Sequence, residues 1–225
     1  MHLADMLKSA IPQVKMRQMT ISVCGPVLGV ALYNRNHPRL WGENCIKSND
    51  QVIEYIKQHK SVKYVVMGSI FSQYVGEANL MLRSGEITRG KQVAKNAIID
   101  TIKTLKQLNV TPIIVSPPPK NGENHPRCLL KSKMFNFSLE ICHMSRSQYE
   151  DYQDIINGLV HVLSNYAQVI WLDKVLCDAK VCKTYLGEII VFRDREHFSY
   201  EGSGWIGKQI NAQKYFPKLF ELRKN

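Results

Sequence analysis

Short apolar runs alternate with long amphipathic segments, and this alternation constrains the fold more than any other feature of the sequence. Buried strands are predicted at Lys63–Met67, Thr111–Ser116 and Val169–Leu172. Apolar residues spaced three and four apart predict helices between them, at Arg89–Asn109 and at residues 147–166. Strands that alternate with helices are typical of a parallel sheet covered on both faces. The predicted fold class is therefore α/β, a three-layer α/β/α sandwich with a mostly parallel sheet.

The rest of the chain is less regular. Its 225 residues are enough for one substantial core, and no internal repeat is present, so one domain covering residues 1–225 is expected. The other predicted elements are a short helix at residues 2–11, a strand at Gln18–Val23, a loop at residues 27–48, a helix capped by Asn49 or Asp50, and irregular chain at residues 120–146.

The formal net charge of +11 raises the question of an anionic partner. The basic residues are spread along the chain, without an arginine-rich arm, a zinc finger or an aromatic RNA-binding motif, so no nucleic acid is expected. A solvated basic surface is the preferred interpretation; in an exported protein it would face anionic lipid or polysaccharide. No stretch is long enough to span a membrane, and Asp5 and Lys8 interrupt the only early apolar segment, so no signal peptide is predicted.

The six cysteines form an even set without a C-x-x-C motif, which argues against redox motifs and zinc ribbons. Their spacing suggests three local pairs, although sequence alone leaves fifteen connectivities open. Disulfides are favoured over reduced thiols because four of the six lie in polar loops, and this implies an oxidising compartment. The suggested pairs are Cys24–Cys45, Cys128–Cys142 and Cys177–Cys182.

The stretch Asp194–Gly202 lies between an apolar run, Ile189–Phe192, that predicts a buried strand and a segment that predicts the last helix, starting near Trp205. An Asp and a His three residues apart on such a loop can face each other. The carboxylate of Asp194 would then hold one imidazole nitrogen of His197 and leave the other free to act as a base on a hydroxyl nucleophile.

Ligand sites in parallel sheets lie at the carboxyl ends of the strands. Gly25, Gly68, Pro117 and the segment Asp194–His197 each follow a predicted strand, so they are expected on one edge of the sheet.

Three other features are set aside. Gly202–Gly207 satisfies the dinucleotide-binding pattern G-x-G-x-x-G, but too little chain follows for a dinucleotide-binding unit. Gly202–Lys208 satisfies most of a phosphate-loop pattern, but Gln209 stands where a phosphate loop needs Ser or Thr. The other histidines lack metal-ligand spacing, so neither a metal nor a cofactor is expected. Ser69, Ser116 and Ser199 lie near strand ends without a matching nucleophile turn, so structural roles are expected for them.

Several pieces resemble, in order and spacing, the SGNH-type domain attached to membrane-bound acyltransferase-3 proteins, which O-acetylate lipopolysaccharide and other surface glycans. These pieces are Cys24-Gly25-Pro26, Tyr64–Gly68, Ile113–Pro119, Arg127-Cys128 with Cys142, Cys177–Cys182, and Asp194–Gly202. The resemblance implies a flavodoxin-like three-layer sandwich, a surface polysaccharide acceptor, a membrane acyltransferase domain upstream as acyl source, and a place at the periplasmic face of the inner membrane.

The resemblance also implies residue roles. Asp194 and His197 map to two members of a catalytic triad, and Gly25 would supply an oxyanion-hole N–H. Gly68 lies where a Gly-x-Asn block begins, but Ile70 replaces the Asn, so one side-chain donor of the wider hydrolase family is missing. Oxyanion donors contribute about 2–4 kcal/mol each, which weakens an inference of ordinary esterase activity.

The nucleophile of that family is the Ser of a Gly-Asp-Ser-His block, and no Gly-Asp-Ser occurs in the 225 residues. His2–Leu7 resembles the helix that follows the block, so we expect the chain to begin just after the nucleophile, with the first, central strand missing. The chain alone is then expected to be inactive. The main hypothesis is a carbohydrate O-acyltransferase domain that acts through an acyl-Ser; the alternatives are a non-catalytic glycan-binding or interaction module and a secreted carbohydrate esterase.

Overall fold

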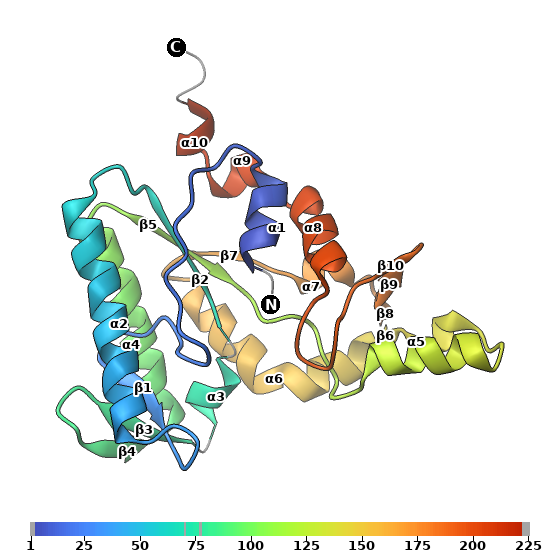
Figure 1. Ribbon diagram of the computed structural model, residues 1–225, viewed down its shortest axis with the longest axis horizontal. Helices are drawn as coiled ribbons and strands as arrows, with labels where there is room; N and C mark the ends of the chain where they lie inside the picture. Colours follow the sequence, from blue (N-terminus) through green and yellow to red (C-terminus); the bar gives the residue numbers. More distant parts are fainter. Residues whose placement is uncertain (1–2, 70, 77, 222–225) are drawn as a thin grey trace. The chain divides into compact units, whose positions relative to one another are not determined.

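A computed structural model describes residues 3–69, 71–76 and 78–221 (Figure 1), so the predictions about His2 and Ile70 lie outside the described residues. The chain divides into two compact units. Unit 1 comprises Met1–Met16, Pro118–Asp154 and Trp171–Asn225. Unit 2 comprises Arg17–Pro117 and Ile155–Ile170. The single domain over residues 1–225 stays a prediction.

Unit 2 contains the predicted parallel sheet. Its strands β2 (Tyr64–Gly68), β5 (Thr111–Val115) and β7 (Gln168–Ile170) pair in the order β2-β5-β7. Residues 113–115 of the central strand are fully buried, as expected for a strand covered on both faces. The three strand predictions from the sequence are confirmed.

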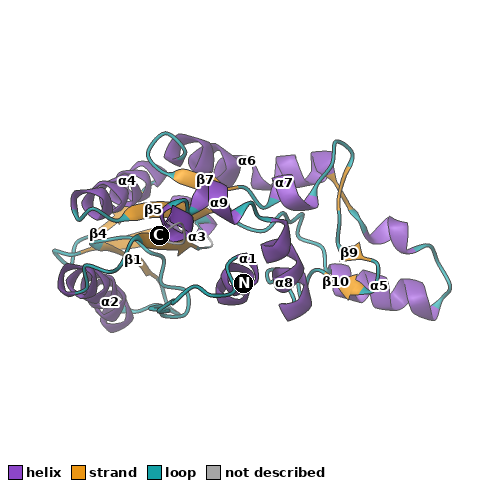
Figure 2. Ribbon diagram, turned by 90° about the horizontal axis from the view of Figure 1, so that it is seen from above, coloured by secondary structure: helices purple, strands orange, loops and turns teal. Residues whose placement is uncertain are grey.

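Three helices accompany this sheet: α2 (Arg39–Gln58), α4 (Lys91–Gln107) and α6 (Arg146–Leu163), of which residues 155–163 belong to unit 2. Figure 2 shows α4 and α6 on one side of the strands of unit 2 and α2 on the other. The apolar stripe of α4 is buried, with Ala94, Ile98 and Ile102 at 0% exposure. The α/β class is confirmed.

Unit 2 also has an antiparallel sheet that the sequence did not indicate. Its strands are β1 (Val30–Tyr33), β3 (Asn79–Leu82) and β4 (Ile87–Arg89), in the order β1-β3-β4, and the short helix α3 (Ser72–Val75) precedes β3. The predicted loop at residues 27–48 is therefore wrong, because β1 and the first half of α2 occupy it.

The strand predicted at Gln18–Val23 is also wrong. The segment is irregular, and Val23 has a φ of 67°, in the left-handed region that interrupts an extended chain. Among the described residues no strand lies beside it to supply a ladder of hydrogen bonds. The predicted cap at Asn49 or Asp50 fails because both lie inside α2: Asn49 Nδ2 donates to the carbonyl of Gly25 at 2.9 Å, and Asp50 forms an ion pair with Arg83.

Unit 1 consists of helices joined by irregular chain and by strands of two residues. Two antiparallel pairs occur, β6 with β8 and β9 with β10, and the first part of α6 also belongs to this unit. The region at residues 120–146, predicted to be irregular, contains a helix, a 3-10 turn and a short strand. The elements are α1 (Leu3–Ala10), α5 (His125–Met134), η1 (Leu139–Cys142), β6 (Met144–Ser145), α7 (Asp173–Leu176), β8 (Val181–Cys182), β9 (Tyr185–Leu186), β10 (Ile189–Ile190), α8 (Tyr200–Gln209), α9 (Ala212–Tyr215) and α10 (Lys218–Glu221).

Helices α1 and α8 lie side by side in unit 1 (Figures 1 and 2). A Cβ atom on Gly207 would lie 2.8 Å from Cβ of Ser9 and would also collide with the carbonyl oxygen of Met6. Glycine at this position therefore permits the close approach of the two helices. This packing explains part of the G-x-G-x-x-G pattern without a nucleotide.

All six cysteines form disulfides, with the pairing suggested by their spacing: Cys24–Cys45, Cys128–Cys142 and Cys177–Cys182. The described residues include no cluster of His, Cys, Asp and Glu suited to a metal ion. None of the described helices combines the length and the apolar character needed to cross a bilayer.

Candidate active site

The segment that carries Asp194 and His197, residues 191–199, is called the Asp–His loop below. It follows β10, which pairs with β9 in an antiparallel hairpin, Ile189 opposite Leu186. The prediction of a buried strand at Ile189–Phe192 is confirmed only in part: the strand is limited to Ile189–Ile190, with Ile190 43% exposed, whereas Val191 and Phe192 are buried and Phe192 forms an isolated bridge with Phe198. Gly187, with a φ of 59°, allows the tight turn that reverses the chain into this hairpin.

Backbone hydrogen bonds close the Asp–His loop on itself. The N–H of Ser199 donates to the carbonyl of Val191 at 2.9 Å, and the N–H of Arg193 donates to that of His197 at 2.8 Å. Phe192 and Phe198 are buried beneath the loop with their ring centroids 5.2 Å apart. The chain between these anchors is thereby held in a defined turn.

Ser199 links the loop to α8, which starts five residues earlier than predicted. Its Oγ accepts a hydrogen bond from the N–H of Gly202 at 2.8 Å, as an N-cap does, and donates to the carbonyl of Ile190 at 2.5 Å. The structural role expected for Ser199 is confirmed.

Asp194 and His197 face each other, as the sequence predicts. The Nδ1 atom of His197 lies 2.9 Å from Oδ1 of Asp194 and 3.0 Å from Oδ2. Oδ1 also accepts the N–H groups of Glu196 and His197, each at 2.8 Å. Among the residues that the structure describes, no hydrogen bond reaches Nε2 of His197. The imidazole is thus oriented through one nitrogen and available through the other.

The surroundings of Asp194 favour its ionised form. Partial desolvation acts to raise the pKa of this carboxyl, but the N–H of Glu196, the imidazole of His197 and the N–H of His197 together lower its pKa to about 2. The side chains of Asp194 and His197 are 40% and 37% exposed, so a substrate can reach the pair from solvent.

A second ion pair supports the loop from within unit 1. Lys120 Nζ lies 2.5 Å from Oε2 of Glu196, the residue that precedes His197. The N–H of Lys120 donates to Oε1 of the buried Gln153 at 2.7 Å. The turn of the Asp–His loop is therefore connected to α6. The sequence gives no local signal of this contact, because its partners are 76 positions apart.

Gly25 lies in unit 2, in a turn that does not follow a strand. Its N–H donates to the hydroxyl of Tyr74 at 2.7 Å, and a Cβ atom at this position would lie 2.8 Å from the ring of Tyr74. Tyr74 is fully buried, and burial raises the pKa of its hydroxyl to about 12 although the hydrogen bond from Gly25 acts to lower it. The oxyanion role of Gly25 stays a prediction, and it requires this N–H to leave Tyr74.

Gly68 is the last residue of β2 and lies opposite Val115, the last residue of β5. Gly68 and Pro117 are therefore at the same carboxyl-terminal edge of the parallel sheet, as predicted. Ser116, between Val115 and Pro117, is buried and its Oγ is 3.4 Å from the carbonyl of Pro117, which fits a structural residue.

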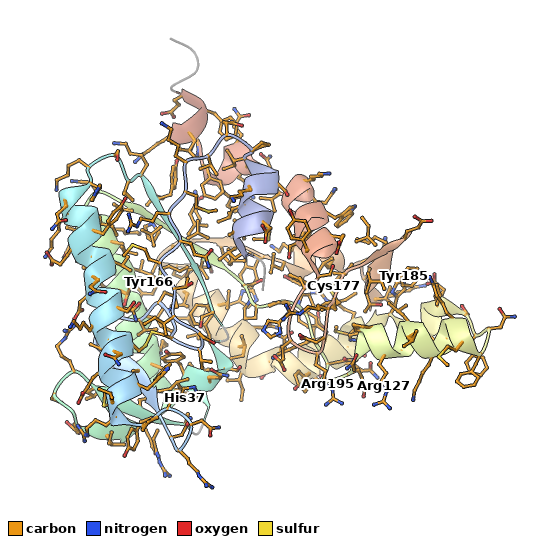
Figure 3. The ribbon with its side chains drawn as sticks, in the orientation of Figure 1. His37, Arg127, Tyr166, Cys177, Tyr185 and Arg195 are labelled. Carbon is orange, nitrogen blue, oxygen red and sulfur yellow. A yellow bond between two sulfur atoms is a disulfide. The ribbon has the colours of Figure 1, made fainter. Side chains whose placement is uncertain are left out.

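Figure 3 shows Arg195, in the turn of the Asp–His loop, with its side chain among those of unit 1.

Comparisons with known proteins bear on the family and the fold of the chain. The family described as the SGNH domain (fused to AT3 domains) matches residues 1–212. Among solved structures, the lipopolysaccharide acetyltransferase periplasmic domain of Salmonella ser. Paratyphi A is similar, with a TM-score of 0.63 and 18% sequence identity. That match covers 97% of this chain and 78% of the Salmonella chain, and it confirms the fold. No curated protein matches the sequence at a significant level.

Proposed function

Since the chain belongs to the family of SGNH domains that are fused to AT3 domains, we propose that it is the extracytoplasmic domain of a carbohydrate O-acyltransferase. The observation that carries this proposal is the Asp194–His197 pair, in which Nδ1 is held and Nε2 is available. The acceptor would be lipopolysaccharide or another surface glycan, a class supported by the similarity to the Salmonella acetyltransferase domain. The acyl source would be a membrane acyltransferase domain, with this domain at the periplasmic face.

The proposed chemistry is acyl transfer through a serine ester. Nε2 of His197 takes the proton of the Ser hydroxyl as its oxygen attacks the acyl carbonyl, and the proton then passes to the departing donor group. A sugar hydroxyl next attacks the acyl-Ser, gives its proton to His197 and leaves as the acylated sugar, while the Ser regains a proton. Asp194 stabilises the imidazolium that forms in each step, because its low pKa keeps it charged.

The Ser of this scheme is not among the 225 residues, which contain no Gly-Asp-Ser. We therefore expect the chain alone not to turn over an activated ester such as p-nitrophenyl acetate. Turnover that disappears in His197→Ala would contradict this expectation and would favour the alternative of a secreted carbohydrate esterase.

The decisive experiment joins the chain, with a Gly-Asp-Ser-His block before Leu3, to an AT3 domain and measures the acetyl content of the surface polysaccharide by NMR. His197→Ala should abolish acetylation, and Asp194→Asn should reduce it by about 10³–10⁴-fold because the imidazole loses its orienting carboxylate. The control is His37→Ala, at a half-buried histidine of unit 2 (Figure 3), which should leave acetylation unchanged.

Ile70, at the position where the wider hydrolase family has the Asn of its Gly-x-Asn block, favours a second candidate, a non-catalytic glycan-binding or interaction module. In that case the fused protein would keep its acetylation after His197→Ala. The same polysaccharide measurement therefore separates the two functions.

A further inference from the structure

One end of unit 1 carries large apolar side chains that no part of the described chain covers. They belong to α5, to the turn after it and to η1, and this segment, residues 127–141, is called the α5 tip below. Five of them are between 61% and 69% exposed: Leu130, Met134, Phe135, Phe137 and Ile141. Such a concentration of exposed apolar residues is typical of an interaction site.

The α5 tip is a folded structure rather than a frayed end. The opposite face of α5 is buried through Leu129 and Ser132, and the disulfide Cys128–Cys142 ties the start of the helix to η1. Asn136, with a φ of 55°, turns the chain between two phenylalanines whose ring centroids lie 6.2 Å apart. The fold therefore holds these apolar side chains in place on its surface.

The charges around these side chains are predominantly positive. Arg127, Lys131 and Lys133 are exposed on α5, and no acidic residue occurs between positions 124 and 139. The acidic residue at the base, Glu140, accepts a hydrogen bond from the hydroxyl of Tyr185 at 2.6 Å and lies 3.3 Å from Nε2 of His143. The surface is thus both apolar and basic.

From this combination we propose that the α5 tip inserts into the surface of an anionic phospholipid bilayer. Phenylalanine, leucine and methionine would enter the boundary between headgroups and acyl chains, while the lysines and Arg127 would remain at the headgroup phosphates. Figures 1 and 2 show α5 and the turn after it at one end of unit 1, a position that suits insertion better than closure around a protein ligand. The proposal does not depend on the catalytic function, because no residue of the Asp–His loop takes part.

The test measures partitioning of the 225-residue chain onto vesicles of 70% phosphatidylcholine and 30% phosphatidylglycerol, with vesicles of pure phosphatidylcholine as the comparison. The double variant Phe135→Ser/Phe137→Ser should weaken partitioning at least about tenfold, because two large apolar side chains no longer enter the bilayer. Lys131→Gln/Lys133→Gln should weaken it by about tenfold to thirtyfold at low salt and reduce its salt dependence.

Two control variants match these changes elsewhere. Leu40→Ser removes a side chain that is 68% exposed on α2, and Lys60→Gln/Lys106→Gln removes the same charge from unit 2. Neither should alter partitioning, and all variants should keep the circular dichroism spectrum of the wild type. The proposal is overturned if the wild type does not bind anionic vesicles, or if the phenylalanine variant binds them as the wild type does. If a fused AT3 domain shields the α5 tip from solvent and the chain binds no vesicles, the proposal is also overturned, and the partner of the tip is then a protein and not a lipid.

Discussion

The Asp–His loop in unit 1 and the turn Cys24–Pro26 in unit 2 both carry residues predicted to act in acyl transfer, and they are held by different means. Local hydrogen bonds and two buried phenylalanines close the loop, with one ion pair from a distant part of the chain, Lys120–Glu196, and the reactive atom Nε2 of His197 remains available. The turn is held by long-range contacts: the disulfide to Cys45, the Asn49 amide and the Tyr74 hydroxyl. The Tyr74 hydroxyl occupies the N–H of Gly25 that was expected to bind an oxyanion.

The difference shows what each region is organised to do. The loop orients a partly exposed acid–base pair, whereas the turn keeps its own polar groups satisfied in a buried place. Removing single contacts should therefore disturb the two regions in different ways, which the following predictions test.

The largest effect on stability is expected from removing the disulfide that holds the turn. Cys24→Ala/Cys45→Ala opens a loop with a sequence separation of 21 and should lower the free energy of unfolding by about 3 kcal/mol, because the unfolded chain gains entropy. The control, Cys177→Ala/Cys182→Ala, opens a separation of 5 and should cost about 2 kcal/mol. Urea unfolding measures both, and a larger loss for the shorter loop would contradict the prediction.

A smaller loss is expected when the support of the Asp–His loop is changed. In Gly202→Ala the new Cβ would lie 2.8 Å from Cα of Val191 and would also collide with the carbonyl of that residue. Because both atoms belong to the backbone, no change of side-chain rotamer can relieve the collision. The free energy of unfolding should fall by about 2 kcal/mol. The control is Gly158→Ala in α6, where nothing lies within 4 Å, and it should raise stability by up to about 1 kcal/mol. Equal stability of the two variants would show that the loop is not packed as described.

These two regions also show which contacts can be predicted from the sequence. The hydrogen bond between Asp194 and His197 was predictable because its partners are three positions apart, and short spacings suggested the three disulfides, although the sequence alone left fifteen connectivities open. The contact of Gly25 with Tyr74 spans 49 positions and has no local signal. Asn49 has the side chain of a helix cap, but its amide donates to the carbonyl of Gly25, so a tertiary contact determined its place.

The same reasoning applies to the strands. The three parallel strands were recognised from their continuous apolar runs, which are typical of parallel sheets, although the central strand β5 is buried over most of its length whereas β2 is mostly half-buried. The run Ile189–Phe192 has the same composition, but β10 pairs with β9 in a short hairpin, and the choice of pairing partner is not encoded in the run itself. The segment Gln18–Val23 shows the converse, since a strand-like composition does not form a strand where no neighbour pairs with it.

An intermediate effect should follow from removing the hydroxyl that satisfies Gly25. Tyr74→Phe leaves the buried N–H of Gly25 without its acceptor and should lower the free energy of unfolding by about 1–2 kcal/mol. Tyr152→Phe, at a tyrosine that is 54% exposed, should have no measurable effect in the same urea titration. A Tyr74→Phe variant as stable as the wild type would mean that the N–H of Gly25 finds another acceptor. The turn would then not depend on its long-range contact with Tyr74.

The smallest effect concerns the charge of Asp194. Folding lowers the pKa of this carboxyl from its ordinary value of 3.8 to about 2, so the stability that its ionised form provides is complete above about pH 4 and is lost as the pH falls towards 2. In His197→Ala one of the hydrogen bonds that lower this pKa disappears, and the pKa should rise, but it should stay below 3.8 because the N–H of Glu196 still donates to Oδ1.

Carbon-13 NMR titration of the side-chain carboxyls measures this shift directly. Asp178 serves as the control within the same protein, because its pKa is lowered by hydrogen bonds from the N–H groups of Val181 and Lys180 and not by His197. The pKa of Asp178 should be the same in wild type and variant. An unchanged pKa of Asp194 in His197→Ala would show that the imidazole does not bind the carboxylate in solution. The loop would then lack the one contact that distinguishes it, as a catalytic element, from the turn at Gly25.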